Sequence, residues 1–269
     1  GPVLMAWGLS VAVLLFQREL GTSILLFGLF IAMLYVATER LSWVLIGLAL
    51  SLAGVLVVAS QVGYVQARFD VWLHALDPEI YNRNPGGSGQ IVSGLFGLAN
   101  GGLMGTGWGE GYPWLTYSAN ADMIIASLGE ELGLTGVLAI LLIYVVIVQR
   151  GLRTAVGIRD GFGKLLATGL AFTMALQVFV VVGGVTRVIP LSGLTMPFLA
   201  AGGSSLLANW IILALLLRLS DGARRPSSIS EPAPVVVVGS AASGPVAPKP
   251  AASPAAAEPH GSGSAVSPS

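Results

Sequence analysis

Long apolar stretches separated by short polar segments make up most of the sequence. We interpret five of them as membrane spans, at residues 22–37, 41–61, 123–149, 163–185 and 193–219. A further stretch, 2–16, has only fifteen residues, whereas a helix needs about 20 apolar residues to cross the hydrocarbon layer. The pattern predicts an all-α, polytopic transmembrane helix bundle of about five to six spans, the first of them partial.

The beginning of the chain differs from a secretory signal. No basic residue precedes the stretch 2–16, whereas a signal peptide starts with positive charge. The sequence also begins with Gly1 instead of Met. We therefore expect a fragment that begins inside or just before a span.

One connection, residues 62–121, is far longer than a simple link between two spans. Connections in compact domains have a median of about 4–6 residues, so a structureless loop of this length is not expected. Its sequence predicts a short interfacial helix at 67–79, a turn at 84–89, a shallow second helix at 91–99 and a glycine-rich loop at 101–111.

The end of the chain has a different composition. Residues 222–269 hold nine of the fifteen prolines, with many alanines and serines. This part lacks the large apolar residues that a packed core requires. The sequence thus predicts an integral membrane domain over 1–221 and a disordered tail over 222–269.

Composition supports the membrane assignment and excludes several classes of protein. Hydrophobic residues make up 54% of the chain and charged residues 10%, against roughly 25% charged in an average globular protein. The net charge of zero argues against a nucleic-acid binder that relies on bulk positive charge. The absence of cysteine excludes disulfides, and two histidines, His74 and His260, do not make a His-rich metal site.

Positive charges predict the orientation in the membrane. Arg150, Arg153 and Arg159 fall in one short loop, and Arg224 and Arg225 follow the last span. Such clusters mark the cytoplasmic side. The long loop is then extracellular and the tail cytoplasmic.

Asp122 is the first candidate for chemistry, because it lies where the long loop enters a span. A carboxylate at a helix start is often only a cap. The alternative is a general base at the outer face, whose pKa is raised by the apolar neighbours Ala121, Met123 and Ile124. Local sequence leaves both open.

Glu130 and Glu131 lie further along the same span. Carboxylates within a span are costly, and they usually face a cavity or a cation. We expect either a functional role or a structural ion pair, with Arg187 or Arg68 as the partner.

Two other segments are unusual for a membrane protein. Gln17, Arg18 and Glu19 place polar groups at the outer mouth of a span, as caps or interfacial anchors. The run 185–205 is interrupted by prolines and glycines, and broken backbone at membrane depth survives only where protein or water satisfies it. This segment therefore predicts a cavity or a re-entrant turn.

Glycines suggest two further features. The segment GTGWGEG, 105–111, is a weak match to a phosphate-binding loop because no strand precedes it, and we interpret it as a flexible hinge. Gly129 and Gly133 form a GxxxG pair, which favours close helix packing.

Four blocks in a fixed order resemble the SEDS family (shape, elongation, division and sporulation). They are QRELGT (17–22), RFDVWLHALDP (68–78), GGLMGTGWGEG (101–111) followed by NADMIIASLGEELGLTG (120–136), and IPLSGLTMPFLAAGGSS (189–205). The resemblance covers roughly residues 15–220 and is most similar to RodA-like actinobacterial members. Family members have about ten spans, so it implies the C-terminal half of such a protein.

The resemblance implies a peptidoglycan glycosyltransferase that polymerises lipid II in the bacterial plasma membrane, in cell elongation or division, together with a class B penicillin-binding protein. Asp122 would be the catalytic base of an inverting transfer. The charge on the leaving pyrophosphate requires cations, and we infer from their outer position that Arg18, Arg68 and Arg187 are the candidates that bind it. An Mg²⁺ or Mn²⁺ ion would be compatible with this chemistry, but no metal ligand is assigned. The supporting residues implied are Gln17, Glu19, Glu130, Glu131, Pro190, Ser204 and Ser205.

Two alternatives have different chemistry. A lipid II flippase would also use intramembrane carboxylates and broken helices, but the polar groups here cluster in the outer half of the spans. A non-catalytic, partner-binding fragment is the other alternative.

Overall fold

The computed structural model describes residues 20–224, with the backbone alone for residues 20 and 57–59. Regular structure in this range is entirely helical, which confirms the all-α prediction there. The elements are α2 (Leu20–Thr38), α3 (Leu41–Gln61), α4 (Gly63–Leu73), α5 (Pro78–Tyr81), α6 (Gly89–Gly101), the short 3₁₀ helix η1 (Pro113–Leu115), α7 (Ile124–Gly157), α8 (Gly161–Val185) and α9 (Gly203–Arg224). The predicted partial span at 2–16, residues Gln17, Arg18 and Glu19, and the tail beyond Arg224 lie outside the described residues.

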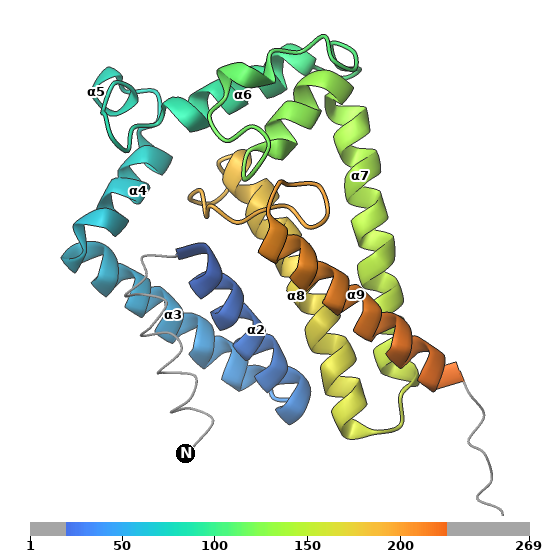
Figure 1. Ribbon diagram of the computed structural model, residues 1–269. Helices are drawn as coiled ribbons and strands as arrows, with labels where there is room; N and C mark the ends of the chain where they lie inside the picture. The colour runs from blue at the N-terminus through green and yellow to red at the C-terminus, as the bar shows by residue number, and fades with distance from the viewer. Residues whose placement is uncertain (1–19, 225–269) are drawn as a thin grey trace, which may run out of the picture. The chain divides into compact units, whose positions relative to one another are not determined.

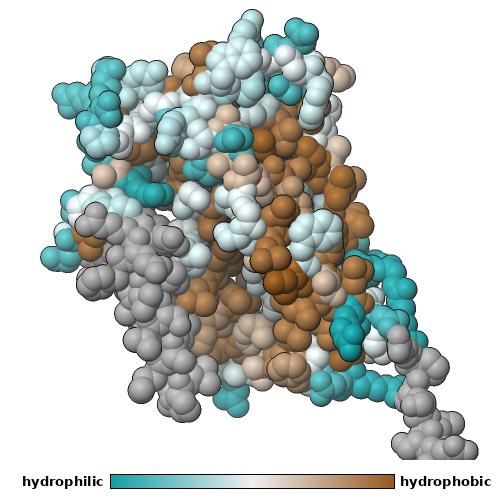
Figure 2. All heavy atoms as spheres, in the orientation of Figure 1, coloured by the Kyte–Doolittle hydropathy of each residue, from teal (hydrophilic) through white to brown (hydrophobic). Residues whose placement is uncertain are grey.

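Four of the described helices are long and apolar enough to cross a membrane: α2, α7, α8 and α9. The helix α3 occupies the predicted span 41–61, with a shorter apolar stretch over Leu41–Leu56. Figure 2 shows hydrophobic surface over the spans and hydrophilic surface at both ends of the bundle, including the end where the long loop lies. A multi-pass membrane protein follows from these lengths and compositions.

The helices α7 and α8 form the centre of the bundle. The helix α2 packs on α8, α3 packs on α2, and α9 contacts both α7 and α8. Between α7, α8 and the segment that follows α8 lies a core that includes Met123, Tyr144, Val181 and Met196. The start of α8 is fixed by Asp160, whose carboxylate accepts a hydrogen bond from the Gly163 N–H at 2.8 Å.

The long loop is largely ordered into helices, as the sequence predicts. The helices α4, α5 and α6 follow one another across one end of the bundle (Figure 1). The shallow helix expected at 91–99 lies within α6, which packs against α7. The interfacial helix expected at 67–79 is divided instead, because α4 ends at Leu73 and α5 begins only at Pro78, and the residue before a proline disfavours a helical conformation. The long loop thus covers the point where α7 begins.

The helix α7 is broken at Gly133, whose φ of 70° and ψ of −176° are not helical. The glycine-rich loop that follows α6 pairs with the backbone groups that the break frees. The Thr106 N–H donates to the Glu130 carbonyl at 2.9 Å and the Gly107 N–H to the Glu131 carbonyl at 3.0 Å. Beyond the break, the Leu134 N–H donates to the Gly102 carbonyl at 2.9 Å. Every one of these contacts replaces a helical bond, so the break costs little in an apolar setting.

This arrangement corrects two expectations. The first residues of the segment 105–111 are fixed on α7 and do not form a flexible hinge, because the Thr106 and Gly107 amides donate hydrogen bonds to α7 carbonyls. Gly133 allows a close approach of the loop backbone instead of a second helix, since a side chain there would meet Gly105 and Leu103.

The run between α8 and α9 also differs in part from the prediction. Residues 193–202 were expected to begin a span, but α9 starts only at Gly203. We call residues 186–202, between α8 and α9, the irregular segment. It is held by side chains from α8 and α7: the Gln177 amide donates to the Thr195 carbonyl at 2.9 Å, and the Tyr144 hydroxyl donates to the Pro197 carbonyl. The expected break in this region is confirmed, and its polar backbone is satisfied by protein.

The break in α7 generates a stability prediction. We expect Gly133→Ala to destabilise the protein for two reasons. The backbone conformation at Gly133 alone should cost an alanine about 1–3 kcal/mol. A Cβ at this position would also overlap the backbone of Leu103 and Gly105. Thermal unfolding of the detergent-solubilised protein measures this. Gly157→Ala, at the open end of the same helix, is the control and should change stability little. Equal effects of the two substitutions would contradict the role given to Gly133.

Candidate functional site

Asp122 lies two residues before α7, in a turn that is anchored on both sides. The Ala121 and Met123 N–H groups donate to the Ser118 carbonyl at 2.9 and 3.2 Å. Met123, the next residue, is fully buried in the core. The Asn120 carbonyl accepts a hydrogen bond from the Ala201 N–H at 2.8 Å. The carboxylate is therefore presented by a rigid turn at the junction of loop, α7 and the irregular segment.

The Asp122 side chain faces a cavity of about 410 Å³. Three polar side chains from different parts of the chain, Asp122, Arg68 of α4 and Gln90 of α6, line it together with Tyr64. The Gln90 amide donates to both carboxylate oxygens of Asp122 at 3.3 Å. The rest of the wall is made by the glycines Gly86, Gly87 and Gly193 and by the apolar side chains of Ala67, Val71, Ile91 and Leu191. The cavity thus combines one carboxylate and one guanidinium with an otherwise largely apolar wall.

Burial raises the pKa of Asp122 above its usual value of 3.8, because a carboxylate loses hydration there. Its own backbone N–H, the Gln90 amide, the Arg68 charge and Ser118 lower the pKa and offset part of this increase. The net direction is upward. A carboxylate in this environment holds a proton more readily than one in water, as a general base must.

Arg68 is positioned by two contacts. Its Nη1 donates to the Leu191 carbonyl at 2.6 Å, and its guanidinium lies 5.7 Å from the centre of the Tyr64 ring. A guanidinium has five N–H donors, so this anchoring leaves donors for an anion in the cavity. Arg68 therefore joins α4 to the irregular segment and brings positive charge to Asp122.

The structure places Arg187 elsewhere. Its Nε and Nη2 donate to the Trp72 carbonyl at 3.2 and 2.7 Å, while the Trp72 indole donates to the Arg187 carbonyl at 2.9 Å. Arg187 is not among the residues that line the Asp122 cavity. Its guanidinium ties the turn after α8 to the end of α4, so it supports the cavity from outside.

Glu130 is buried, with 5% of its surface exposed, and its Oε1 accepts two hydrogen bonds. The donors are the Asn100 amide and the Tyr112 N–H, both at 3.1 Å. The prediction of an ion pair with Arg68 or Arg187 is wrong. Within residues 20–224 neither arginine pairs with Glu130 or Glu131, because Arg68 and Arg187 donate to backbone carbonyls instead. Glu130 fixes the loop that closes the break in α7, and Glu131 contributes its carbonyl.

The remaining predicted residues lie in or beside the irregular segment. Ser205 accepts a hydrogen bond from the Thr195 hydroxyl at 2.8 Å and so links the segment to α9. Pro190 is half-buried and Ser204 is exposed. None of the three lines the Asp122 cavity. These residues shape the segment without reaching the carboxylate.

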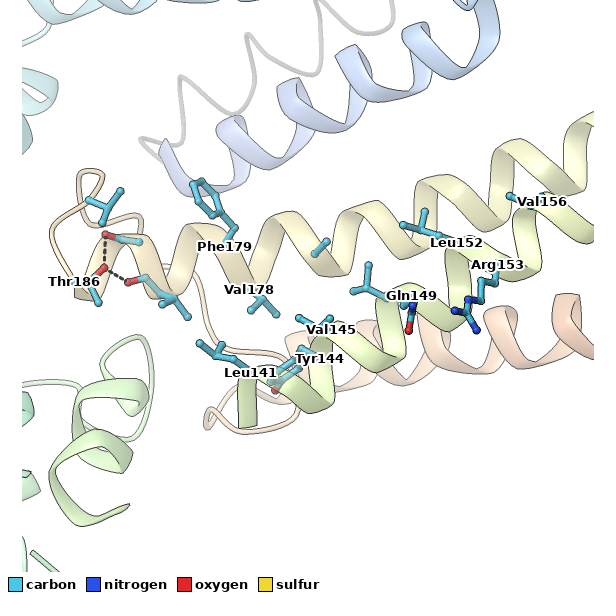
Figure 3. Close-up of a pocket in the computed structure, with 15 residues that line it drawn as sticks. Leu141, Tyr144, Val145, Gln149, Leu152, Arg153, Val156, Val178, Phe179 and Thr186 are labelled. Carbon is cyan, nitrogen blue, oxygen red and sulfur yellow. Dashed lines mark hydrogen bonds between the residues drawn. The ribbon is translucent and has the colours of Figure 1, made fainter. Parts of the chain in front are cut away.

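A second cavity, of about 700 Å³, is an apolar groove between α7 and α8. Figure 3 shows Thr186 at one end and Gln149 and Arg153 toward the other, with aliphatic and aromatic side chains between them. Val188 lines this groove and Leu191 lines the Asp122 cavity, so the irregular segment runs from one to the other. This apolar groove between two spans shares no lining residue with the Asp122 cavity.

Sequence analysis missed Gln90, Tyr64 and Asn100. Gln90 is the first polar residue inside the apolar stretch that follows the NPGGSG turn, and this isolated amide was the available signal. Nothing local to Tyr64 or Asn100 indicates that they face Arg68 or Glu130.

The described residues do not form a metal site of their own. In the range 20–224 no three His, Asp or Glu side chains converge, and Asp122 is the one acidic residue lining its cavity. A divalent cation would need most of its ligands from a substrate or from water.

Comparison with known proteins identifies relatives. A family model described as cell cycle protein, FtsW/RodA/SpoVE, matches residues 1–225. The chain is 54% identical over 226 residues to peptidoglycan glycosyltransferase RodA of Mycobacterium tuberculosis, covering 84% of this chain and 47% of that protein. It is 34% identical over 227 residues to a probable peptidoglycan glycosyltransferase FtsW of a Geobacter species, covering 83% of this chain and 60% of that protein. The chain thus spans about half the length of the curated RodA relatives that it matches.

A chain of a solved peptidoglycan synthase complex shares the fold. The TM-score is 0.66 at 23% sequence identity, over 81% of this chain and 60% of that one. That complex is one in which polymerization and crosslinking are structurally coordinated.

The contacts of Glu130 generate a second stability prediction. We expect Glu130→Ala to destabilise the protein by about 1–3 kcal/mol, because the Asn100 amide and the Tyr112 N–H both lose the acceptor that the buried Glu130 provides. Glu130→Gln keeps an acceptor oxygen and should cost less. Thermal unfolding compares these variants with Glu131→Ala, whose side chain makes no described hydrogen bond. If Glu131→Ala proves as damaging as Glu130→Ala, the assignment is wrong.

Proposed function

The chain belongs to the FtsW/RodA/SpoVE family of cell cycle proteins, and from this membership we propose that the intact protein polymerises lipid II into peptidoglycan glycan strands. The observation that carries the proposal is the cavity in which Asp122 faces Arg68 and Gln90. It supplies the two groups that glycosyl transfer from a pyrophosphate requires: a base for the acceptor and a cation for the leaving group.

The proposed reaction is a single displacement. An acceptor sugar hydroxyl attacks the anomeric carbon of the donor, and the bond from that carbon to the pyrophosphate oxygen breaks with inversion. The hydroxyl proton passes to the Asp122 carboxylate. Pyrophosphate leaves as an anion without needing a proton, so a second carboxylic acid is unnecessary, unlike in glycoside hydrolysis.

Arg68 supports this reaction from the side of the leaving group. It lines the same cavity as Asp122 and is held by Leu191, so its charge is in place before the pyrophosphate leaves with its additional negative charge. Arg18 is also proposed to bind the pyrophosphate, although it lies outside the described residues. Arg187 is proposed only as a support for α4, because it does not line the Asp122 cavity and is bound to the Trp72 carbonyl.

The lipid tail of the substrate is assigned to the apolar groove between α7 and α8. The groove is lined almost throughout by aliphatic and aromatic side chains. The segment between Val188 and Leu191 connects one end of it to the Asp122 cavity. This supports an arrangement with the polyprenyl chain in the bilayer and the sugar–pyrophosphate at its surface.

Orientation, partner and domain organisation complete the proposal. Arg150, Arg153, Arg159 and Lys164 surround the connection between α7 and α8, which favours a cytoplasmic position for that end and an outer position for Asp122.

A class B penicillin-binding protein is the proposed partner, in keeping with the related synthase complex, in which polymerization and crosslinking are coordinated. Residues 1–221 are the proposed membrane domain and 222–269 a cytoplasmic tail.

Asp122→Asn tests the base. We expect it to lower lipid II polymerisation by about 10²–10⁴-fold, because an amide cannot accept the proton. Its stability at neutral pH should not fall, since burial disfavours the ionised carboxylate that it replaces. Polymer on gels, made by the full-length protein with its partner, is the measurement. Asp70→Asn, on α4 and outside the cavity, is the matched control, and a wild-type rate in Asp122→Asn would refute the proposal.

The pH profile tests the electrostatics. The base acts only when ionised, so the rate should rise with pH through the pKa of Asp122, which lies above 3.8. Arg68 lowers this pKa, so Arg68→Gln should move the rise to higher pH. Arg83→Gln, an outer arginine that does not line the cavity, should leave the profile in place. A shift in the opposite direction with Arg68→Gln would show that another group controls the rise.

A further inference from the structure

Three arginines line one small pocket at the end of α7 that is remote from Asp122. The pocket has a volume of about 260 Å³, and Arg150, Arg153 and Arg224 line it together with Ser220 and Thr154. Two of the arginines come from α7 and the third from the last turn of α9. Like charges gathered in this way repel one another unless an anion lies between them.

The pocket opens directly into an apolar groove. A cavity of about 660 Å³ between α7 and α9 shares Arg150, Thr154, Ser220 and Arg224 with it. Apart from those shared residues and from Gly151 and Asp221, the groove is lined by aliphatic side chains of the spans: Val146, Ile147, Leu213, Leu216 and Leu217. Arg153 in turn also lines the groove between α7 and α8 (Figure 3). The arginine pocket is therefore flanked by apolar grooves on both sides.

The arginines of the pocket outnumber the acidic residues around it. Three arginines and no acidic residue line the pocket itself, and Asp221 is the one acidic residue that lines the adjoining α7–α9 groove. The pocket thus keeps a surplus of positive charge at the membrane boundary.

We propose that this pocket binds the anionic headgroup of a phospholipid, with an acyl chain of the same molecule in the α7–α9 groove. Charge complementarity selects a phosphate, and the adjoining groove selects a molecule that also carries a hydrocarbon chain. A free phosphate would use the first feature and leave the second unused. With the proposed orientation, the lipid belongs to the cytoplasmic leaflet.

The proposal does not depend on the glycosyltransferase chemistry, since the pocket shares no residue with the Asp122 cavity. Binding can therefore be measured without an activity assay, and either proposal can fail alone. The bound lipid would hold α9 against α7 at the end where both helices leave the membrane.

Native mass spectrometry of the full-length protein tests the site. Phosphatidylglycerol and phosphatidylcholine with identical acyl chains are added separately, and retained lipids are counted. We expect Arg150→Gln/Arg153→Gln/Arg224→Gln to lower the preference for phosphatidylglycerol by about tenfold or more. Arg159→Gln/Lys164→Gln/Arg218→Gln removes as much charge from the same side without touching the pocket, and it should retain the preference.

Two further variants separate charge from shape and guard against misfolding. Arg150→Lys/Arg153→Lys/Arg224→Lys keeps the charge and should retain most of the preference. Leu213→Trp fills the groove and should lower phosphatidylglycerol binding although every arginine remains. Equal losses in the two glutamine triple variants would overturn the proposal in favour of diffuse attraction. Unchanged binding in Leu213→Trp, or displacement of the lipid by millimolar inorganic phosphate, would overturn the lipid as occupant.

Discussion

A backbone amide or carbonyl inside an apolar bundle must have a partner, and this requirement governs the architecture around α7. The helix is broken at Gly133, and the loop after α6 returns to pair with the groups on both sides of the break. Glu130 then binds the far end of that loop through the Tyr112 N–H. Because the loop is fixed, α6 is fixed, and with it Gln90, the side chain that holds the Asp122 carboxylate.

The proposed site depends on a balance at Asp122. Burial raises the pKa of its carboxylate, whereas Gln90 and Arg68 lower it. Each of the three side chains belongs to a different segment: the turn before α7, α6 and α4. Arg68 and Arg187 join α4 to the segment after α8. The electrostatic environment of the carboxylate is therefore a property of the assembled loop and no single helix supplies it.

Sequence patterns predicted the features that depend on local composition. The apolar runs located α2, α3, α7 and α8, and the position of Asp122 at the start of a span singled it out. They did not predict the break at Gly133, because glycine is common in unbroken membrane helices as well. They failed at Glu130 for a related reason: opposite charges suggested an ion pair, but the choice of Asn100 and Tyr112 over an arginine depends on how a distant loop folds back.

The break at Gly133 also has a consequence for biogenesis. A nascent α7 that enters the bilayer alone can satisfy the Glu130 and Glu131 carbonyls only with its own amides, those of Leu134 and Thr135, as an unbroken helix. The break requires the Thr106 and Gly107 amides as substitutes. The finished form of α7 is therefore reached only when the outer loop docks on it.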